Sequence, residues 1–248
     1  MPTSVTSLEN VADTLAAMGL FSRRNQPGLK VAYAPRGTDG TLDQTVRVEN
    51  TTEVGVRPVL TFTAVDFYGR ELPNVEVGTV LGIDRGAVVV APGQTAVDVL
   101  HFHGLGARNV RGVNIAMVDA TEADLGGATA PVEALMVDMN QRATLDPADF
   151  WGVGVVNRND VPVSMKVTLV ELEPEGTGGK DAPRQAVDAV TLTEPVELAS
   201  QSHDVVWLPE EIRGRFHAVI GHLDVPWTGP SDVPDDPREL EPGDGDQG

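Results

Sequence analysis

The dominant pattern along the chain is an alternation of hydrophobic and polar residues with a period of two. Thr45-Val46-Arg47-Val48-Glu49 is a clear example, and such alternation is typical of a strand with one buried and one solvated face. The same signal, bounded by turn residues, predicts strands at 29–34, 45–49, 59–68, 75–81, 87–90, 97–102, 110–118, 132–139, 150–156, 161–172, 186–192, 205–208 and 216–225. Short strands at this spacing predict a mainly β protein built of antiparallel sheets.

The clearest helical period lies near the N-terminus, at residues 6–20. Thr6 and Glu9 form a capping box at its start, and Gly19 is suited to end it. The hydrophobic residues of the segment fall on one stripe: Leu8, Val11, Leu15 and Met18. Such a stripe usually packs on the protein's own core, and this is the favoured interpretation. The alternative is an arm that docks on another subunit.

A change of composition divides the chain into two halves. Residues 120–130 are rich in glycine, alanine and acidic residues, which favours a boundary there. We therefore predict two tandem antiparallel β-sandwich domains, immunoglobulin-like in architecture, after an N-terminal helix. The expected bounds are a helical arm at 1–27, a first sandwich at 28–122, a second at 130–227 and a disordered acidic tail at 228–248.

The two halves share a sequence pattern. In each, a strand ends in asparagine (Asn50, Asn157), a short polar turn follows, and a Pro-Val pair (Pro58, Pro162) leads into a long strand. Asparagine tolerates turn conformations, and proline enters a strand only at its start or on an edge. Further matches are 90–95 with 198–202, 113–119 with 218–224, and the acidic residues Asp66 and Glu171. The pattern favours duplication of one unit.

The unit resembles bacterial immunoglobulin-like modules of the FxLYD type. The likeness is carried by Asn50, Pro58, Phe62, the corner Asp66-Phe67-Tyr68-Gly69 and the turn Pro92-Gly93. The second half lacks the aromatic corner and the Pro-Gly turn. The resemblance implies a sandwich that serves in binding or as a spacer and carries no enzyme activity.

Charge and composition narrow the functional classes. The formal net charge is -19, from 37 acidic and 18 basic residues, which disfavours binding to nucleic acid or to an anionic membrane surface. Cysteine is absent, so disulfides, thiolate metal sites and cysteine nucleophiles are excluded. The chain shows no apolar run of the roughly 20 residues that span a bilayer and no signal peptide, which predicts a cytoplasmic protein.

The sequence offers few candidates for chemistry. His101-Phe102-His103 would place two imidazoles on one strand face, about 7 Å apart, a spacing that some metal sites use. Two polar residues on a solvated face are the favoured interpretation, because a histidine pair supplies too few ligands. His203, His217 and His222 are expected to be surface or hydrogen-bonded interior groups. Trp151, Trp207 and Trp227 are candidate interface anchors, although core packing is favoured for each.

These features predict a non-catalytic protein, either an interaction subunit or a structural component of a larger assembly, with a virion protein as one version. Its partner would be another protein or a further copy of the chain, without a cofactor, and no small-molecule ligand is expected. The rival hypothesis is a metal-dependent enzyme or binder centred on His101 and His103. A carbohydrate-binding sandwich is disfavoured, since aromatic residues make up only 4% of the chain.

Overall fold

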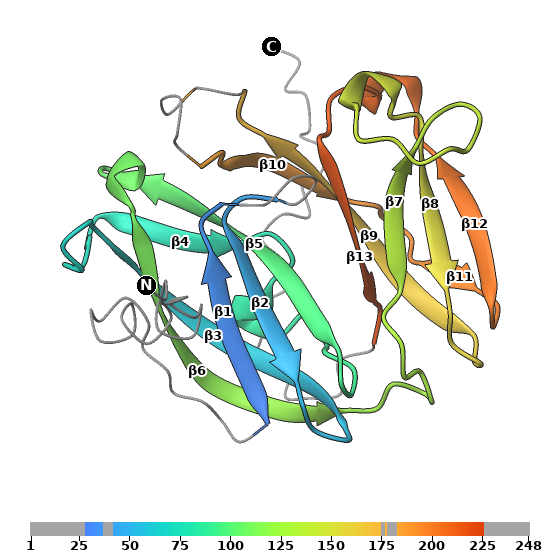
Figure 1. The fold of residues 1–248 in the computed structure, drawn as a ribbon, viewed down its shortest axis with the longest axis horizontal. Coiled ribbons are helices and arrows are strands. Elements are labelled where there is room, and N and C mark those ends of the chain that lie inside the picture. The colour runs from blue at the N-terminus through green and yellow to red at the C-terminus, as the bar shows by residue number, and fades with distance from the viewer. Residues whose placement is uncertain (1–27, 37–41, 175–176, 178–182, 226–248) are drawn as a thin grey trace, which may run out of the picture.

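The computed structural model describes residues 28–36, 42–174, 177 and 183–225. The helix predicted at 6–20, with Leu8, Val11, Leu15 and Met18, lies outside these residues, as do Trp227 and the predicted tail. The described part is mainly β, with several antiparallel sheets, as the alternating pattern predicted (Figure 1).

The described residues of the first half form six strands in two sheets. They are β1 (Leu29–Ala34), β2 (Thr45–Asn50), β3 (Gly55–Val65), β4 (Val75–Thr79), β5 (Thr95–Gly104) and β6 (Gly112–Ala123). Four of them form a sheet in the order β1-β2-β5-β4, and β3 pairs with β6. All of these pairings are antiparallel.

In the second half, the part that the structure describes forms seven strands. They are β7 (Glu133–Val137), β8 (Gly152–Asn157), β9 (Val163–Leu172), β10 (Ala186–Thr191), β11 (Val196–Leu198), β12 (Ser202–Trp207) and β13 (Ala218–Leu223). One sheet has the order β12-β8-β7. In the other, β10 and β11 follow one another along one edge of β9, and β13 pairs with its opposite edge. The order of pairing resembles that of the first half, since β7-β8-β12 matches β1-β2-β5 and β9-β13 matches β3-β6.

Several details of the strand prediction are wrong. The strand predicted at 59–68 is β3, which ends at Val65, so that residues 66–68 lie in a turn. Residues 87–90 form no strand, and only Val90 makes an isolated bridge, to Val56. The three-residue strand β11 was missed because a run this short carries too little alternation to be recognised.

The asparagines that end β2 and β8 make matching hydrogen bonds. The Nδ2 of each donates to the carbonyl four residues later, at 2.7 Å from Asn50 and 2.9 Å from Asn157. It also donates to a distant carbonyl, that of Val90 at 3.0 Å or Ala199 at 2.8 Å. Each Oδ1 accepts the backbone N–H two residues on, at 2.9 Å. Both side chains are buried, so each amide fixes the turn that follows its strand.

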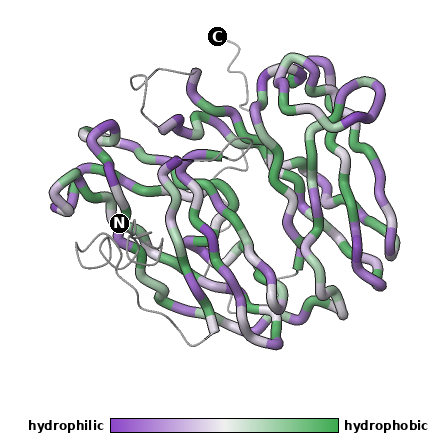
Figure 2. Tube along the Cα trace, in the orientation of Figure 1, coloured by the Kyte–Doolittle hydropathy of each residue, from purple (hydrophilic) through white to green (hydrophobic). Residues whose placement is uncertain are grey.

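Each half has a cluster of buried hydrophobic residues, supplied by alternate strand positions. Figure 2 shows hydrophobic and hydrophilic residues interleaved along the strands. Val46 and Val48 point into the first cluster, while Arg47 between them is exposed. The largest fully buried side chains include Leu60, Leu100, Phe150, Leu169 and Phe216.

The first cluster continues into the second half through β9. Leu169 belongs to the second cluster, whereas Val170 and Leu172 belong to the first. Val99 on β5 is fully buried although it has the opposite parity to Leu100, so both faces of β5 are covered. β10 of the second half contacts β5, and its Ala186 and Ala189 pack against the first cluster. The two halves are therefore joined by an apolar contact between sheets.

Candidate interaction site

A tight turn after β3 is held rigidly by one carboxylate. The Oδ1 of Asp66 accepts the backbone N–H groups of Tyr68 at 2.8 Å and Arg70 at 3.0 Å. Its Oδ2 lies 2.7 Å from the Nη2 of Arg70, and the hydrogen bonds from Arg70 lower the pKa of this carboxyl. Gly69, at φ 75°, supplies the left-handed residue that the turn requires.

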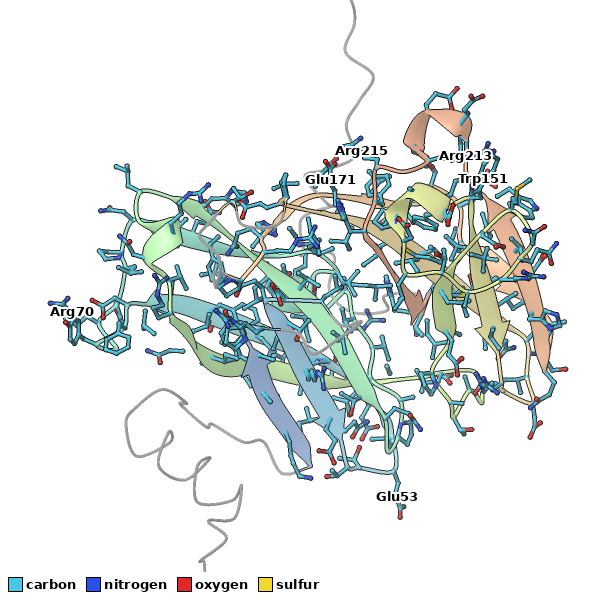
Figure 3. The ribbon with its side chains drawn as sticks, turned by 45° about the horizontal axis from the view of Figure 1, so that its top comes forward. Glu53, Arg70, Trp151, Glu171, Arg213 and Arg215 are labelled. Carbon is cyan, nitrogen blue, oxygen red and sulfur yellow. The ribbon has the colours of Figure 1, made fainter. Side chains whose placement is uncertain are left out.

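This aromatic turn, residues 66–70, presents two rings to solvent. Phe67 and Tyr68 are each 77% exposed, and their rings meet edge to face with centroids 5.4 Å apart. The guanidinium of Arg70 lies 5.0 Å from the centre of the Tyr68 ring. Figure 3 shows Arg70 at the end of the molecule farthest from Trp151. Exposed aromatic side chains on a fixed backbone are typical of anchors in protein interfaces.

A second turn repeats this geometry after β7. The Oδ1 of Asp138 accepts the N–H groups of Asn140 at 2.8 Å and Arg142 at 2.9 Å, and Gln141, at φ 62°, takes the place of the glycine. Met139 at its tip is 62% exposed. The shared sequence is Val-Asp-x-x-x-Arg, at 65–70 and 137–142.

The sequence comparison matched Asp66 with Glu171, and the structure shows that this match is wrong. Glu171 lies within β9 and accepts a hydrogen bond from the Nε of Arg215 at 2.6 Å. Asp66 lies in a turn beyond its strand. The Val-Asp-x-x-x-Arg pattern marks two turns of the same geometry, although they follow strands that do not correspond in the two halves.

The predicted histidine pair lies together on β5. The ring centroids of His101 and His103 are 4.6 Å apart, and the imidazole of His101 lies over Gly78 on β4, so close that a Cβ there would be 2.1 Å from its Nε2. Within the described part of the chain, no group of three or more histidine, aspartate or glutamate side chains is placed to hold a metal ion.

Asp98, on the opposite face of β5, is fully buried. Its oxygens accept the backbone N–H groups of Leu81 at 2.7 Å, Ile83 at 2.9 Å and Val99 at 2.7 Å. Burial outweighs these bonds and raises its pKa to about 6. All three donors are backbone groups of the core, so this carboxylate fixes the loop after β4.

The described tryptophans lie at one end of the second half. The guanidinium of Arg213 lies 4.7 Å from the centre of the Trp151 ring (Figure 3). Trp207 is 47% exposed, and its ring packs over Gly152. Trp151 is half-buried and packs against an arginine of the same chain, whereas Trp207 is more exposed.

One histidine differs from its prediction. The Nδ1 of His222 on β13 is buried and has no hydrogen-bond partner, although a hydrogen-bonded or surface histidine was expected. His217 accepts the N–H of Leu172 at 3.3 Å.

The chain matches no protein-family model, and no curated protein matches it. In the part of the chain that the structure describes, no helix is long and apolar enough to cross a membrane.

Proposed function

We propose that this protein is a non-catalytic interaction or structural subunit, built of two sandwich-like units of immunoglobulin type, and that it contacts a protein partner through the aromatic turn. The supporting observation is the pair of rings, Phe67 and Tyr68, each 77% exposed on a turn fixed by Asp66. An enzyme needs converging ionisable groups. Within the described residues, Asp66, Asp98 and Asp138 instead hold turns and loops through backbone hydrogen bonds, and the histidine pair on β5 is joined by no group of three or more metal-binding side chains.

The two exposed rings of the aromatic turn are suited to anchor a partner protein. Two adjacent rings present a large apolar area, and burying apolar surface contributes about 25 cal/mol per Å². Because the turn is already fixed by the bonds to Asp66, little conformational entropy remains to be lost on binding. Arg70, stacked on Tyr68, adds a cation at the rim of the same surface. One candidate for the partner is a second copy of the same chain within a large assembly, such as a virion.

Site-specific photo-crosslinking tests the proposal. We expect p-benzoylphenylalanine placed at position 67 or 68 to give a discrete adduct in cells that make the protein, whereas the same group at Val118 should not. Val118 is the matched control because it is also exposed, at 58%, but lies on β6, away from the turn. An adduct of twice the chain's mass would identify a second copy as the partner. Equal, diffuse labelling at all three positions would contradict the proposal.

Light scattering gives the second measurement. If the chain assembles with itself, replacing Phe67 and Tyr68 together by serine should lower the mass in solution while leaving the sheet spectrum unchanged, because both side chains lie outside the core. Removal of residues 1–27, which form a docking arm under the alternative interpretation of the N-terminal stripe, is tested in the same way.

A further inference from the structure

Two connections between strands lie next to each other at one end of the first half. The aromatic turn joins β3 to β4, and the second connection joins β5 to β6. Val65 pairs with Gly112, and Val75 pairs with Gly104, so both connections leave the sheets at the same end (Figure 1). The backbone N–H of Arg111 donates to the carbonyl of Val65 at 2.9 Å, which places Arg111 beside the aromatic turn.

The two connections form one exposed surface, which we call the two-turn surface and define as residues 66–70 and 104–111. It carries three large apolar side chains in water. Phe67 and Tyr68 are each 77% exposed, and Leu105 is 87% exposed. Apolar side chains that gather on the surface of a protein mark a site of interaction.

The same surface carries a cation without a counter-charge. The Nη1 of Arg111 donates to the carbonyls of Arg108 at 2.9 Å and Val110 at 2.8 Å. Within the described residues no carboxylate pairs with Arg111, whereas Arg70 pairs with Asp66. An exposed guanidinium of this kind suits an acidic partner, because a carboxylate accepts charge-assisted hydrogen bonds from it.

The chain itself contains a segment of matching chemistry. Residues 226–248 lie outside the described part of the chain, and their sequence has seven acidic residues and one basic residue. It includes Pro234-Asp235-Asp236-Pro237, a P-x-x-P motif with two carboxylates between the prolines. A P-x-x-P segment that binds as a polyproline II helix turns once every three residues, so it presents both prolines on one face. Exposed aromatic side chains are the usual receptors of that face.

The position of Val225 favours the segment of a second copy over the chain's own. The carbonyl of Val225 accepts a hydrogen bond from Nη2 of Arg57 at 2.9 Å. Arg57 precedes Asp66 by nine positions along β3, which is about 30 Å of extended strand. Pro234 is nine residues beyond Val225, at most about 32 Å of chain. The chain's own motif would therefore meet the surface only when fully stretched, which makes its effective concentration low.

We propose that the two-turn surface binds residues 226–248 of a second copy of this chain. The prolines of the P-x-x-P motif lie against Phe67 and Tyr68, and its carboxylates face Arg111. The inference rests on the proposed function, since it uses the aromatic turn, and it names the partner. Because the surface and the segment are different parts of the chain, the contact is head-to-tail and can link copies in series.

A mixing experiment with two full-length variants tests the inference. Phe67→Ser with Tyr68→Ser removes the receiving rings and keeps the segment, whereas Pro234→Ser with Pro237→Ser removes the motif and keeps the surface. Light scattering is measured up to about 1 mM chain, where contacts of micromolar to millimolar Kd are populated. We expect the mass of the unmodified chain to rise with concentration and each variant alone to stay at the mass of one copy. An equimolar mixture should reach the mass of two copies and stop there, because one intact surface and one intact segment remain.

Two single substitutions test the chemistry of the contact. Arg111→Gln should weaken self-association by about two- to fivefold, the range of an exposed ion pair. This difference should disappear when the salt is raised to about 0.5 M. Met139→Ser is the matched control, because Met139 is exposed on the equivalent turn of the second half, and it should leave association unchanged.

Several outcomes would overturn the inference. They are a mixture that stays at the mass of one copy, an unmodified chain that is monomeric throughout, and a Pro234→Ser, Pro237→Ser variant that associates like the unmodified chain. The crosslinks at positions 67 and 68 separate this inference from the proposed function. An adduct with a protein of another mass would keep the aromatic turn as an interaction site and rule out the second copy, whereas absence of any adduct would remove both.

Discussion

Asp98 illustrates how one side chain organises a loop. Its carboxylate is fully buried in β5 and accepts three backbone N–H groups, two of them from the loop between β4 and β5. These donors have no access to water, so they depend on this acceptor. Asp98 thereby aligns Leu81 and Ile83, both buried, with the first hydrophobic cluster.

Replacing Asp98 with alanine is predicted to be strongly destabilising. Three buried N–H groups would lose their acceptor, and each unsatisfied buried donor costs about 1–3 kcal/mol. We expect a loss of roughly 3–6 kcal/mol in the free energy of unfolding at pH 7, measured by urea denaturation. Asp119→Ala is the matched control, because Asp119 is exposed and accepts only the adjacent N–H of Ala120. A loss below 1 kcal/mol at Asp98 would contradict this account.

The raised pKa of Asp98 makes the stability of the folded protein depend on pH, and the direction of this dependence follows from the shift. Its folded pKa of about 6 lies above its ordinary value of 3.8, so between these values the folded protein holds a proton that the unfolded chain has released. The stability contributed by Asp98 is therefore present below pH 4 and declines as the pH rises through 6. The difference in stability between the unmodified chain and Asp98→Ala should follow this slope.

For single residues, the sequence predicted the strand face on which a side chain lies better than it predicted the burial and hydrogen bonding of that side chain. The alternation along β5 correctly predicted that His101 and His103 share one face and lie close together. The burial of Asp98 and the unpartnered Nδ1 of His222 could not be predicted, because both arise from segments distant in sequence. His222 is buried by the contact between halves, which one strand's pattern does not encode.

The strand-ending asparagines act at the scale of the element. Asn50 and Asn157 each connect the end of a strand to the turn beyond it and to a distant carbonyl, with the same atoms in the same roles. A shared side-chain network is a stricter likeness than a shared strand order, because it fixes particular atoms. We infer from it that the two halves derive from one duplicated unit.

This likeness predicts equal effects of one substitution at two positions. Asn50→Ala and Asn157→Ala should each lower the free energy of unfolding by about 2–4 kcal/mol, since each removes a buried amide that donates two hydrogen bonds to backbone carbonyls and accepts one from a backbone N–H. Asn109→Ala, at an exposed position, should change it by less than about 0.5 kcal/mol. The measurement is chemical denaturation of the three variants. A large loss at Asn50 with none at Asn157 would show that the network is not equivalent in the two halves.

Strands were predicted correctly where hydrophobic and polar residues alternate over a long run, and they were missed where the run is short. β1 has the predicted bounds, and β9 differs by two residues at its start. The turn at Asp138 was missed because Gln141, which takes the left-handed conformation there, is not a residue that marks such turns. Gly69, which takes the equivalent left-handed conformation in the aromatic turn, is a typical turn residue.

At the scale of the whole molecule, the contact between halves is the feature that sequence reasoning understated. The run Val167-Thr168-Leu169-Val170-Glu171-Leu172 is apolar on both faces, a pattern typical of a strand covered on both sides. The structure accounts for it, since Leu169 and Val170 belong to different clusters. The separate cores were expected from composition, but the packing of β10 beside β5 required the pairing of distant strands.

Arg57 joins the two halves at the end of β13. Its side chain is buried, with Nη1 donating to the carbonyl of Gly86 at 2.7 Å and Nη2 to the carbonyl of Val225 at 2.9 Å. Burial lowers its pKa, while the charge of Asp224 opposes that shift. Because one guanidinium spans 168 residues of sequence, it holds the end of the second half against the first.

Substituting Arg57 with methionine should loosen this junction without unfolding either half. Methionine fills a similar volume but leaves two carbonyls without a donor, at a cost of about 2–4 kcal/mol. We expect faster hydrogen exchange at Val225, Asp224 and Gly86, measured by mass spectrometry, while β2 and β8 keep their protection. Arg47→Met is the control, because Arg47 is exposed on β2. If exchange rises equally across the chain, the halves form one cooperative unit; if it rises nowhere, the apolar contact through Val170 and Leu172 holds them together and the arginine is dispensable.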